Sequence, residues 1–207
     1  MSKFLSTTFG KISGKHGTAV GSTYNGESVL KVYTRPSNPK TVGQQSQRLK
    51  FGMVAHALNS LRNIITVGFG SKNGYYQAVS LAIRNAIEGS YPAFSVNYAN
   101  VVLSSGSLPQ SPAVSISAPG NMNVAVAWDT TVWSTADASD PVYVAFLNPL
   151  TQMVIFAEAQ AKRGDGAVTI LLPAPWLGAT LHAWLFFTSD NRRLSSVSQY
   201  LGTVVPA

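Results

Sequence analysis

The sequence predicts an α+β protein, in which an N-terminal β-hairpin and a two-helix region are joined to a C-terminal immunoglobulin- or fibronectin-like β-sandwich. Three observations predict this fold: an Asn-Gly pair between two strand-like runs, apolar residues that then recur at spacings of three and four, and an apolar period that changes to two beyond residue 94. We therefore divide the chain into a flexible basic arm (1–17), a hairpin plus helical region (18–111) and a sandwich domain (112–207).

The hairpin is predicted from residues 18–24 and 27–34, two runs rich in β-branched residues and tyrosine that flank Asn25-Gly26. Asn-Gly accommodates positive φ at both central positions of a type I′ turn, which is the favoured connection in a tight hairpin. Because an isolated hairpin is only marginally stable in water, we expect this one to pack on the rest of the chain or on another molecule.

Two amphipathic helices are predicted after the break at Arg35–Pro39. The first spans about residues 42–66, and its inward side chains are expected to be Phe51, Val54, Leu58, Leu61 and Ile65. The second spans about residues 74–88 and ends at Gly89, a typical C-terminal glycine. Its inward side chains are expected to be Tyr76, Val79, Ile83, Ala86 and Ile87.

The rest of the chain predicts strands. Short ones at 94–97 and 100–104 precede a Pro-rich linker at 106–112. Seven more follow, at about 113–118, 122–128, 142–148, 152–159, 167–172, 180–188 and 194–204. Seven short strands separated by turn residues are typical of an immunoglobulin-like or fibronectin-type sandwich. Its core aromatic residues are expected to be Trp128, Phe146, Phe156, Trp184 and Phe186.

The net charge of +7 is concentrated at the N-terminus. Residues 1–50 contain eight basic residues and one acidic residue, whereas residues 51–207 contain seven of each. Charged residues make up only 11% of the chain, well below the roughly 25% typical of globular domains. A surface poor in charge favours a protein that packs against neighbours.

Little in the sequence predicts catalysis, so we expect no enzyme, no catalytic residue, no metal and no cofactor. The chain has no cysteine, and no two of its histidines, His16, His56 and His182, lie at a metal-ligand spacing. The Gly10–Gly17 run is not a phosphate-binding loop, because Gly14-Lys15 is followed by histidine instead of Ser or Thr. Arg163–Asp165 matches the integrin-binding tripeptide, but a charged turn between two strands accounts for it.

The basic N-terminal segment is the predicted partner-binding site. Its predicted contact residues are Lys11, Lys15, Tyr24, Lys31, Tyr33, Arg35 and Arg48. Cations interleaved with aromatic rings could contact the phosphates and bases of nucleic acid, or an acidic protein surface. A solvated basic hairpin without a charge-specific partner is the third interpretation.

Several motifs along the chain resemble one uncharacterised family. They are Gly10–Gly21, Asn38–Phe51, Gly89–Pro92, Ser105–Pro109, Trp128-Asp129, Ala145–Pro149 and Ser198–Gly202. The chain is similar to a domain-of-unknown-function family (the 6266 series) of Bacteroidota and their mobile elements. This family has no established activity, so the resemblance implies no catalytic residues. The Asn38–Phe51 motif also resembles small proteins encoded among phage structural genes.

These observations favour a non-enzymatic structural or assembly protein: a homo-oligomeric subunit of a phage virion, in a capsid-decorating, fibre, spike or tail-associated position. Its expected partners are other protein subunits, contacted through the basic N-terminal segment. The first alternative is a nucleic-acid-binding protein that uses the same segment. The second is a carbohydrate- or surface-binding sandwich with Trp133 or Trp176 exposed on loops. The sequence has no signal-peptide-like or membrane-spanning apolar run, so we expect a virion or cytoplasmic location and no membrane partner.

Overall fold

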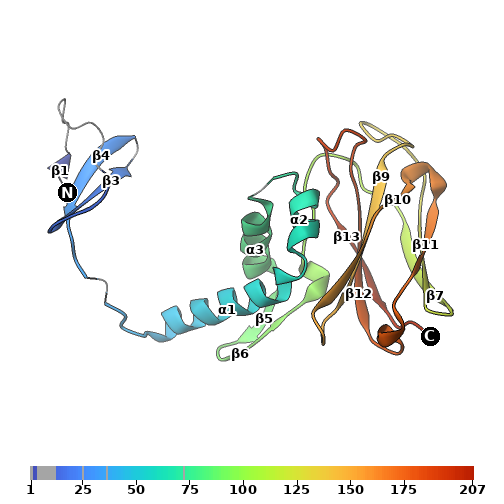
Figure 1. The fold of residues 1–207 in the computed structure, drawn as a ribbon, viewed down its shortest axis with the longest axis horizontal. Helices are drawn as coiled ribbons and strands as arrows, with labels where there is room; N and C mark the ends of the chain where they lie inside the picture. The colour runs from blue at the N-terminus through green and yellow to red at the C-terminus, as the bar shows by residue number, and fades with distance from the viewer. Residues whose placement is uncertain (1, 4–12, 25, 36, 72) are drawn as a thin grey trace. The chain divides into compact units, whose positions relative to one another are not determined.

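The computed structural model describes residues 2–3, 13–24, 26–35, 37–71 and 73–207 (Figure 1). Its helices and antiparallel strands confirm a mixed α+β protein. The chain divides into two compact units, Met1–Thr41 and Val42–Ala207. This division differs from the predicted boundaries at residues 17 and 111.

The first unit is a four-stranded antiparallel sheet of β1 (Ser2–Lys3), β2 (Gly14–His16), β3 (Ala19–Tyr24) and β4 (Glu27–Val32), in the order β1-β4-β3-β2. Strands β3 and β4 pair from Tyr24 opposite Glu27 to Ala19 opposite Val32, the pairing that an Asn-Gly turn predicts. Strands β1 and β2 fall within the predicted flexible arm. They lie on the sheet instead because β3 and β4 offer unpaired backbone groups on their outer edges. Residues 4–12 of that arm lie outside the described residues.

The second unit begins with helices α1 (Val42–Asn59), α2 (Arg62–Gly68) and α3 (Gly74–Asn85). The single helix predicted over 42–66 is wrong, because the chain turns at Leu61, whose backbone N–H donates to Leu58. Leu58, Leu61 and Ile65 are all fully buried. The apolar spacing continues through the turn, so the sequence pattern carries no sign of the change in direction.

The second predicted helix is too long. It ends at Asn85, and residues Ile87–Ser90 form β5, which pairs with β6 (Ala93–Val96). Gly89 has φ +86°, but it lies in the β5–β6 hairpin and not at the end of a helix. A β-carbon there would meet the Ala93 carbonyl oxygen. The predicted strand at 94–97 corresponds to β6, whereas the strand predicted at 100–104 is an extended segment after a short 3-10 helix, η1 (Tyr98–Asn100).

All seven remaining predicted strands are present, and they form two sheets. One has the order β10-β9-β12-β13 and the other the order β11-β8-β7. Their bounds are β7 Val114–Gly120, β8 Asn123–Trp128, β9 Pro141–Asn148, β10 Met153–Lys162, β11 Ala167–Leu171, β12 Leu181–Phe187 and β13 Gln199–Val204. Two further 3-10 turns, η2 (Arg163–Asp165) and η3 (Ala174–Trp176), lie in the connections before and after β11.

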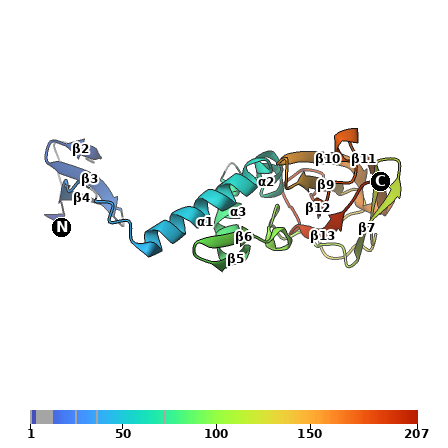
Figure 2. The same ribbon diagram turned by 90° about the horizontal axis from the view of Figure 1, so that it is seen from below.

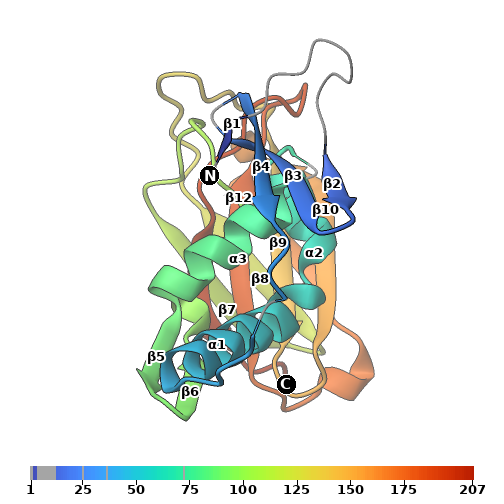
Figure 3. The ribbon, with the colours of Figure 1, turned by 90° about the vertical axis from the view of Figure 1, so that its left-hand side faces the viewer.

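The four-stranded sheet is covered on both faces. Alternate residues of β9 and β12 pack either against β8 and β11 or against the three helices, as Val144 and Tyr143 do respectively. The helices cover the outer face of the sheet (Figure 3). Strands buried on both faces are nearly continuous apolar runs, which explains the sequences of β9 and β12. Because these strands belong to both cores, the helical region and the sandwich form one unit.

The predicted aromatic core is therefore only partly correct. Trp128 and Phe146 do lie between the two sheets. Phe156, Trp184 and Phe186 instead pack on the helix side of the sheet. The alternation that predicts a strand does not say which of its faces meets the second sheet and which meets a helix. Two further aromatic residues of the core between the sheets, Trp176 and Phe187, were not among those predicted.

Candidate partner-binding surface

Four of the predicted contact residues lie on one face of the N-terminal sheet. Lys15 on β2 is opposite Val20 on β3, and Val20 is opposite Lys31 on β4, so the two lysines share a row across the sheet. Tyr24 lies on the same face as Val20, and Tyr33 on the same face as Lys31, since side chains two or four residues apart point to the same side. The hydrogen bond from Tyr33 N to Thr18 O, 2.7 Å long, extends this strand pairing past β4.

The rings and cations of this face are open to solvent. Tyr24 is 62% exposed and Tyr33 is 41% exposed, and the side chains of Lys15 and Lys31 are also exposed. The Lys15 ammonium lies 4.1 Å from the centroid of the Tyr33 ring. A cation–π contact at such an exposed site is worth about 0.5–1 kcal/mol, so it orders the pair and leaves the charge accessible. We call Lys15, Tyr24, Lys31 and Tyr33 the basic aromatic face.

The described residues of the sheet that carries this face bury little apolar surface. Among its described residues, Val29 is the one large apolar side chain that is buried, whereas Val32 on the opposite face is 80% exposed. Small sheets depend on buried apolar surface for stability, and the described part of this one offers Val29 alone.

The other three predicted contact residues are not on the described strands of this sheet. Arg35 follows β4 in an extended, exposed segment, and Arg48 lies on α1 in the second unit. Lys11 lies outside the described residues.

The N-terminal half of α1 is a second exposed surface. Val42 and Phe51 are 66% and 58% exposed, so the inward position predicted for Phe51 is wrong. The hairpin β5–β6 supports this half of the helix (Figure 2): Tyr91 Oη donates to Gln45 Oε1 at 2.9 Å, and the Lys50 ammonium lies 4.9 Å from the ring of Phe94. Only the later part of the apolar stripe, from Val54 onward, reaches the main core.

Tyr76 on α3 also differs from its predicted inward position, because it is 64% exposed. It borders a shallow hollow of about 670 Å³ beside α3. The hollow is lined by Phe69, Asn73, Tyr76, Gln77, Ser80, Leu81, Arg84 and Ser105. Arg84 is held there by its own helix, through a 2.8 Å hydrogen bond from Nη2 to Ser80 Oγ.

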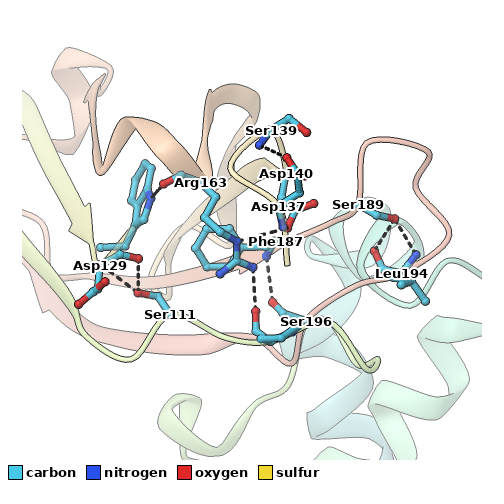
Figure 4. Close-up of polar contacts among 12 residues, drawn as sticks. Ser111, Asp129, Asp137, Ser139, Asp140, Arg163, Phe187, Ser189, Leu194 and Ser196 are labelled. Carbon is cyan, nitrogen blue, oxygen red and sulfur yellow. Dashed lines mark hydrogen bonds and ion pairs between the residues drawn. The ribbon is translucent and has the colours of Figure 1, made fainter. Parts of the chain in front are cut away.

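In the Arg-Gly-Asp turn the arginine is buried, whereas Gly164 and Asp165 are exposed (Figure 4). The Arg163 side chain is fully buried, and its Nε lies 3.3 Å from Asp140 Oδ2. Its Nη2 donates to Pro109 O at 2.8 Å, and its guanidinium lies 3.9 Å from the ring centroid of Phe187. Burial lowers the pKa of Arg163 from its ordinary value, and the charge of Asp140 opposes that effect. A receptor cannot reach this arginine. Nothing in the sequence around Arg163 indicates that its side chain is buried.

The three histidines have different environments. His16 and His56 are exposed. His182 on β12 is half-buried, with its ring 4.5 Å from that of Tyr98 and its Nδ1 2.7 Å from the hydroxyl of Tyr200. Within the part of the chain that the structure describes, no three His, Asp or Glu side chains come together to hold a metal.

The two tryptophans considered for glycan binding have different environments. Trp133 is 42% exposed in the loop between β8 and β9. Trp176, by contrast, is 2% exposed and packs in the core between the sheets, so its predicted exposure is wrong. The connection that carries Trp176 folds back onto the sandwich through a 3-10 turn. In the described ranges there is no helix with the length and apolar character to cross a membrane.

The architecture is thus that of a two-unit α+β protein with an exposed basic aromatic face on its small N-terminal sheet. The chain belongs to a family of unknown function, DUF6266, whose model matches residues 11–202. No curated protein and no solved structure matches it. The family resemblance in the sequence motifs is therefore confirmed, whereas the association with Bacteroidota and with phages stays a prediction.

Proposed function

We propose that this protein is a non-enzymatic structural or assembly subunit whose basic aromatic face binds other protein subunits. The observation that carries the proposal is the combination of Lys15, Tyr24, Lys31 and Tyr33, all exposed, on a sheet with one described buried apolar side chain, Val29. Exposed tyrosines are typical of binding surfaces, and lysines beside them favour a partner of opposite charge. The proposed setting is a phage or phage-like particle, in a capsid-decorating, fibre, spike or tail-associated position, with the protein acting as a homo-oligomer.

Charge indicates what kind of surface this face would meet. Residues 1–41 contain six basic residues and one acidic residue. Two copies of the same basic face would repel each other, because like charges across an interface are unfavourable. The proposed partner surface is therefore acidic, either on another type of subunit or on a different region of a second copy.

We further propose that the two sheets of residues 112–207 form a sandwich of the immunoglobulin or fibronectin class. In support, the first, second and fifth of its seven strands make one sheet, and the third, sixth and seventh pair in the other. The same pairings occur in immunoglobulin domains. The fourth strand, β10, differs from the constant-type arrangement, because it pairs with the third strand, β9, instead of the fifth. Such sandwiches commonly serve as binding or structural modules, and the fold by itself assigns no function.

A nucleic-acid-binding role for the same face is the second candidate. Lys15 and Lys31 share a row, with exposed tyrosine rings on the same face. This combination would suit a single strand, since lysines contact phosphates and rings stack on bases. The two functions differ in salt dependence. Each phosphate contact on a single strand adds about −0.7 to the slope of log affinity against log salt concentration.

The test compares the full chain with two full-length variants, Lys15→Glu/Lys31→Glu and Tyr24→Ser/Tyr33→Ser, by light scattering coupled to size-exclusion chromatography at low and high salt. A matched control, Arg192→Glu, changes an exposed charge in the second unit. We expect defined oligomers for the wild type and the control, and smaller species for both face variants. Far-UV circular dichroism checks that every variant is folded.

Fluorescence anisotropy with a labelled single-stranded oligonucleotide provides the second arm. Binding that falls steeply with salt and is lost in Lys15→Glu/Lys31→Glu would favour the nucleic-acid function. Unchanged oligomers in both face variants, together with no oligonucleotide binding, would refute both proposals for this face.

A further inference from the structure

Helix α3 carries polar side chains along its outer side. They recur at the spacings of three and four residues that align side chains on one side of a helix: Asn73, Tyr76, Gln77, Ser80 and Arg84. With Leu81, and with Phe69 and Ser105 from other segments, they line the hollow of about 670 Å³, which we call the α3 hollow. Because Tyr76 and Arg84 are eight residues apart, the hollow extends for about 12 Å along the helix.

The residues that line the α3 hollow are held by the fold. Tyr76 packs edge-on against Tyr75, with ring centroids 6.1 Å apart, and the Tyr75 hydroxyl donates to a backbone carbonyl of α1 at 3.2 Å. Ser105 follows Ser104, whose buried hydroxyl donates to Ser196 O at 2.8 Å. A site that is formed before its ligand arrives loses little conformational entropy on binding.

The α3 hollow is lined by a cation and by no carboxylate. Arg84 has five N–H donors, of which one on Nη2 meets Ser80 Oγ at 2.8 Å. Among the described residues it makes no ion pair. Glu88, the one acidic residue in the sequence from 51 to 107, accepts a hydrogen bond from Asn97 Nδ2 at 2.6 Å. The planar guanidinium therefore offers its remaining donors to an external carboxylate.

The other polar groups of the α3 hollow match sugar hydroxyls. The amides of Asn73 and Gln77 and the hydroxyl of Ser105 both donate and accept hydrogen bonds, as a sugar hydroxyl does. Within the described ranges these three side chains have no hydrogen-bond partner. Tyr76 is 64% exposed, and its ring offers a flat apolar surface on which the C–H face of a sugar ring can pack.

We propose that the α3 hollow binds a short glycan with a carboxylate-bearing sugar, of the uronic or sialic acid class. The carboxylate meets the guanidinium of Arg84, and a neighbouring sugar ring packs on Tyr76. An acidic peptide fits less well, because peptides are recognised by sheet edges, by apolar grooves or by clusters of arginines, and the lining has a single arginine. This inference goes beyond the proposed function and does not involve the basic aromatic face.

The test is isothermal titration calorimetry of the full chain with two acidic probes, trigalacturonate and sialyllactose, and with their neutral counterparts, maltotriose and lactose. We expect the wild type to bind at least one acidic probe, and to bind its neutral counterpart about tenfold more weakly, because a charged hydrogen bond to Arg84 is lost. Arg84→Gln removes the cation and Tyr76→Ser removes the ring. Each should raise the dissociation constant for the acidic probe by about tenfold.

Three control variants place the binding on the molecule. Arg193→Gln and Trp133→Ala remove an exposed cation and an exposed ring in the loops β12–β13 and β8–β9. Lys15→Glu/Lys31→Glu reverses the charge of the basic aromatic face. All three should bind the acidic probe as tightly as the wild type does, and circular dichroism checks that every variant is folded. Loss of binding in any folded control would assign the sugar to that other surface and overturn the proposal.

Other outcomes would also overturn it. These are a wild type that binds neither acidic probe, equal affinity for an acidic probe and its neutral counterpart, or unchanged affinity in Arg84→Gln. Tighter binding of a triglutamate peptide than of either acidic probe would assign the α3 hollow to an acidic peptide instead. The proposed function is tested by the oligomeric state of the Lys15→Glu/Lys31→Glu variant, so the two proposals can fail separately.

Discussion

Arg163 and Asp140 form an ion pair inside the protein: Nε and Oδ2 are 3.3 Å apart, and neither side chain is more than 3% exposed. The pair fixes the loop β8–β9 to the loop β10–β11, because Arg163 N also donates to Asp140 O at 2.9 Å. The ring of Phe187 lies beneath the guanidinium. A buried charge of this kind depends on its partner.

Removing Asp140 should therefore destabilise the protein. We expect Asp140→Ala to lower the free energy of unfolding by about 3–5 kcal/mol, because the guanidinium of Arg163 stays buried without its counter-ion. Arg163→Met/Asp140→Ala, which removes both charges, should lose less than the sum of the two single variants. Urea denaturation of the four proteins in a double-mutant cycle measures the coupling. If the losses of unfolding free energy in the two single variants simply add in the double variant, Arg163 and Asp140 do not stabilise each other.

Two helical glycines should respond in opposite directions to the same substitution. A β-carbon at Gly68 on α2 would overlap the carbonyl oxygen of Leu103 and lie 2.6 Å from Ser104 Cβ, whereas one at Gly52 on α1 has no atom within 4 Å. We expect Gly68→Ala to cost about 1–3 kcal/mol, and Gly52→Ala to add about 0.5–1 kcal/mol through helix propensity. Urea midpoints compare the two variants directly. Equal effects would contradict the close packing of α2 on residues 103–104.

The helices and the sandwich should unfold together. Phe186 on β12 is fully buried on the helix side of the sheet and stacks on Tyr143, with ring centroids 5.1 Å apart. We expect Phe186→Ala to cost about 3–5 kcal/mol, and the exposed Phe51→Ala to change stability by about 0.5 kcal/mol or less. Far-UV circular dichroism and tryptophan fluorescence should give one common transition for Phe186→Ala. Two separate transitions would show that the helical region is an independent domain.

Stability should fall in mild acid because of His182. Burial lowers the pKa of His182 below its ordinary value of 6.5 and raises the pKa of Tyr200, so Tyr200 can donate to a neutral His182 Nδ1. The unfolded chain binds a proton more readily than the folded one, so this stabilisation is present above pH 6.5 and is lost as pH falls through the folded pKa.

Thermal midpoints measured between pH 7.5 and pH 5 check this expectation. His182→Gln should flatten the pH dependence, because it removes the half-buried imidazole. A wild-type profile identical to that of His182→Gln would contradict the assignment.

The sequence by itself determined the local structure where a short pattern decides the outcome. The seven strands of residues 114–204 follow from period-two patterns and turn residues, and the β3–β4 pairing agrees with the Asn-Gly turn between them. The concentration of charge in residues 1–50 is likewise a property of the sequence alone.

Other features depend on which elements meet in space. The apolar stripe of residues 51–65 has one period throughout, yet Phe51 is exposed and Leu58 is buried, because only part of α1 lies over the sheet. Gly89 has the positive φ expected at a helix end, but it lies in the β5–β6 hairpin.

The candidate surfaces show the same division. Sequence indicated that the N-terminal segment is basic and aromatic, but strand register decided that Lys15 and Lys31 share a row on one face. It also decided that the Asp, Glu, Lys and Arg side chains of residues 112–207 lie toward one end of the two sheets, whereas Leu150 lies at the other. The sequence around Arg163 is that of an exposed turn, but the side chain is buried, since Asp140 in the loop β8–β9 and Phe187 on β12 contact it. Local patterns follow from backbone sterics and solvation, whereas burial depends on partners that only the folded chain brings together.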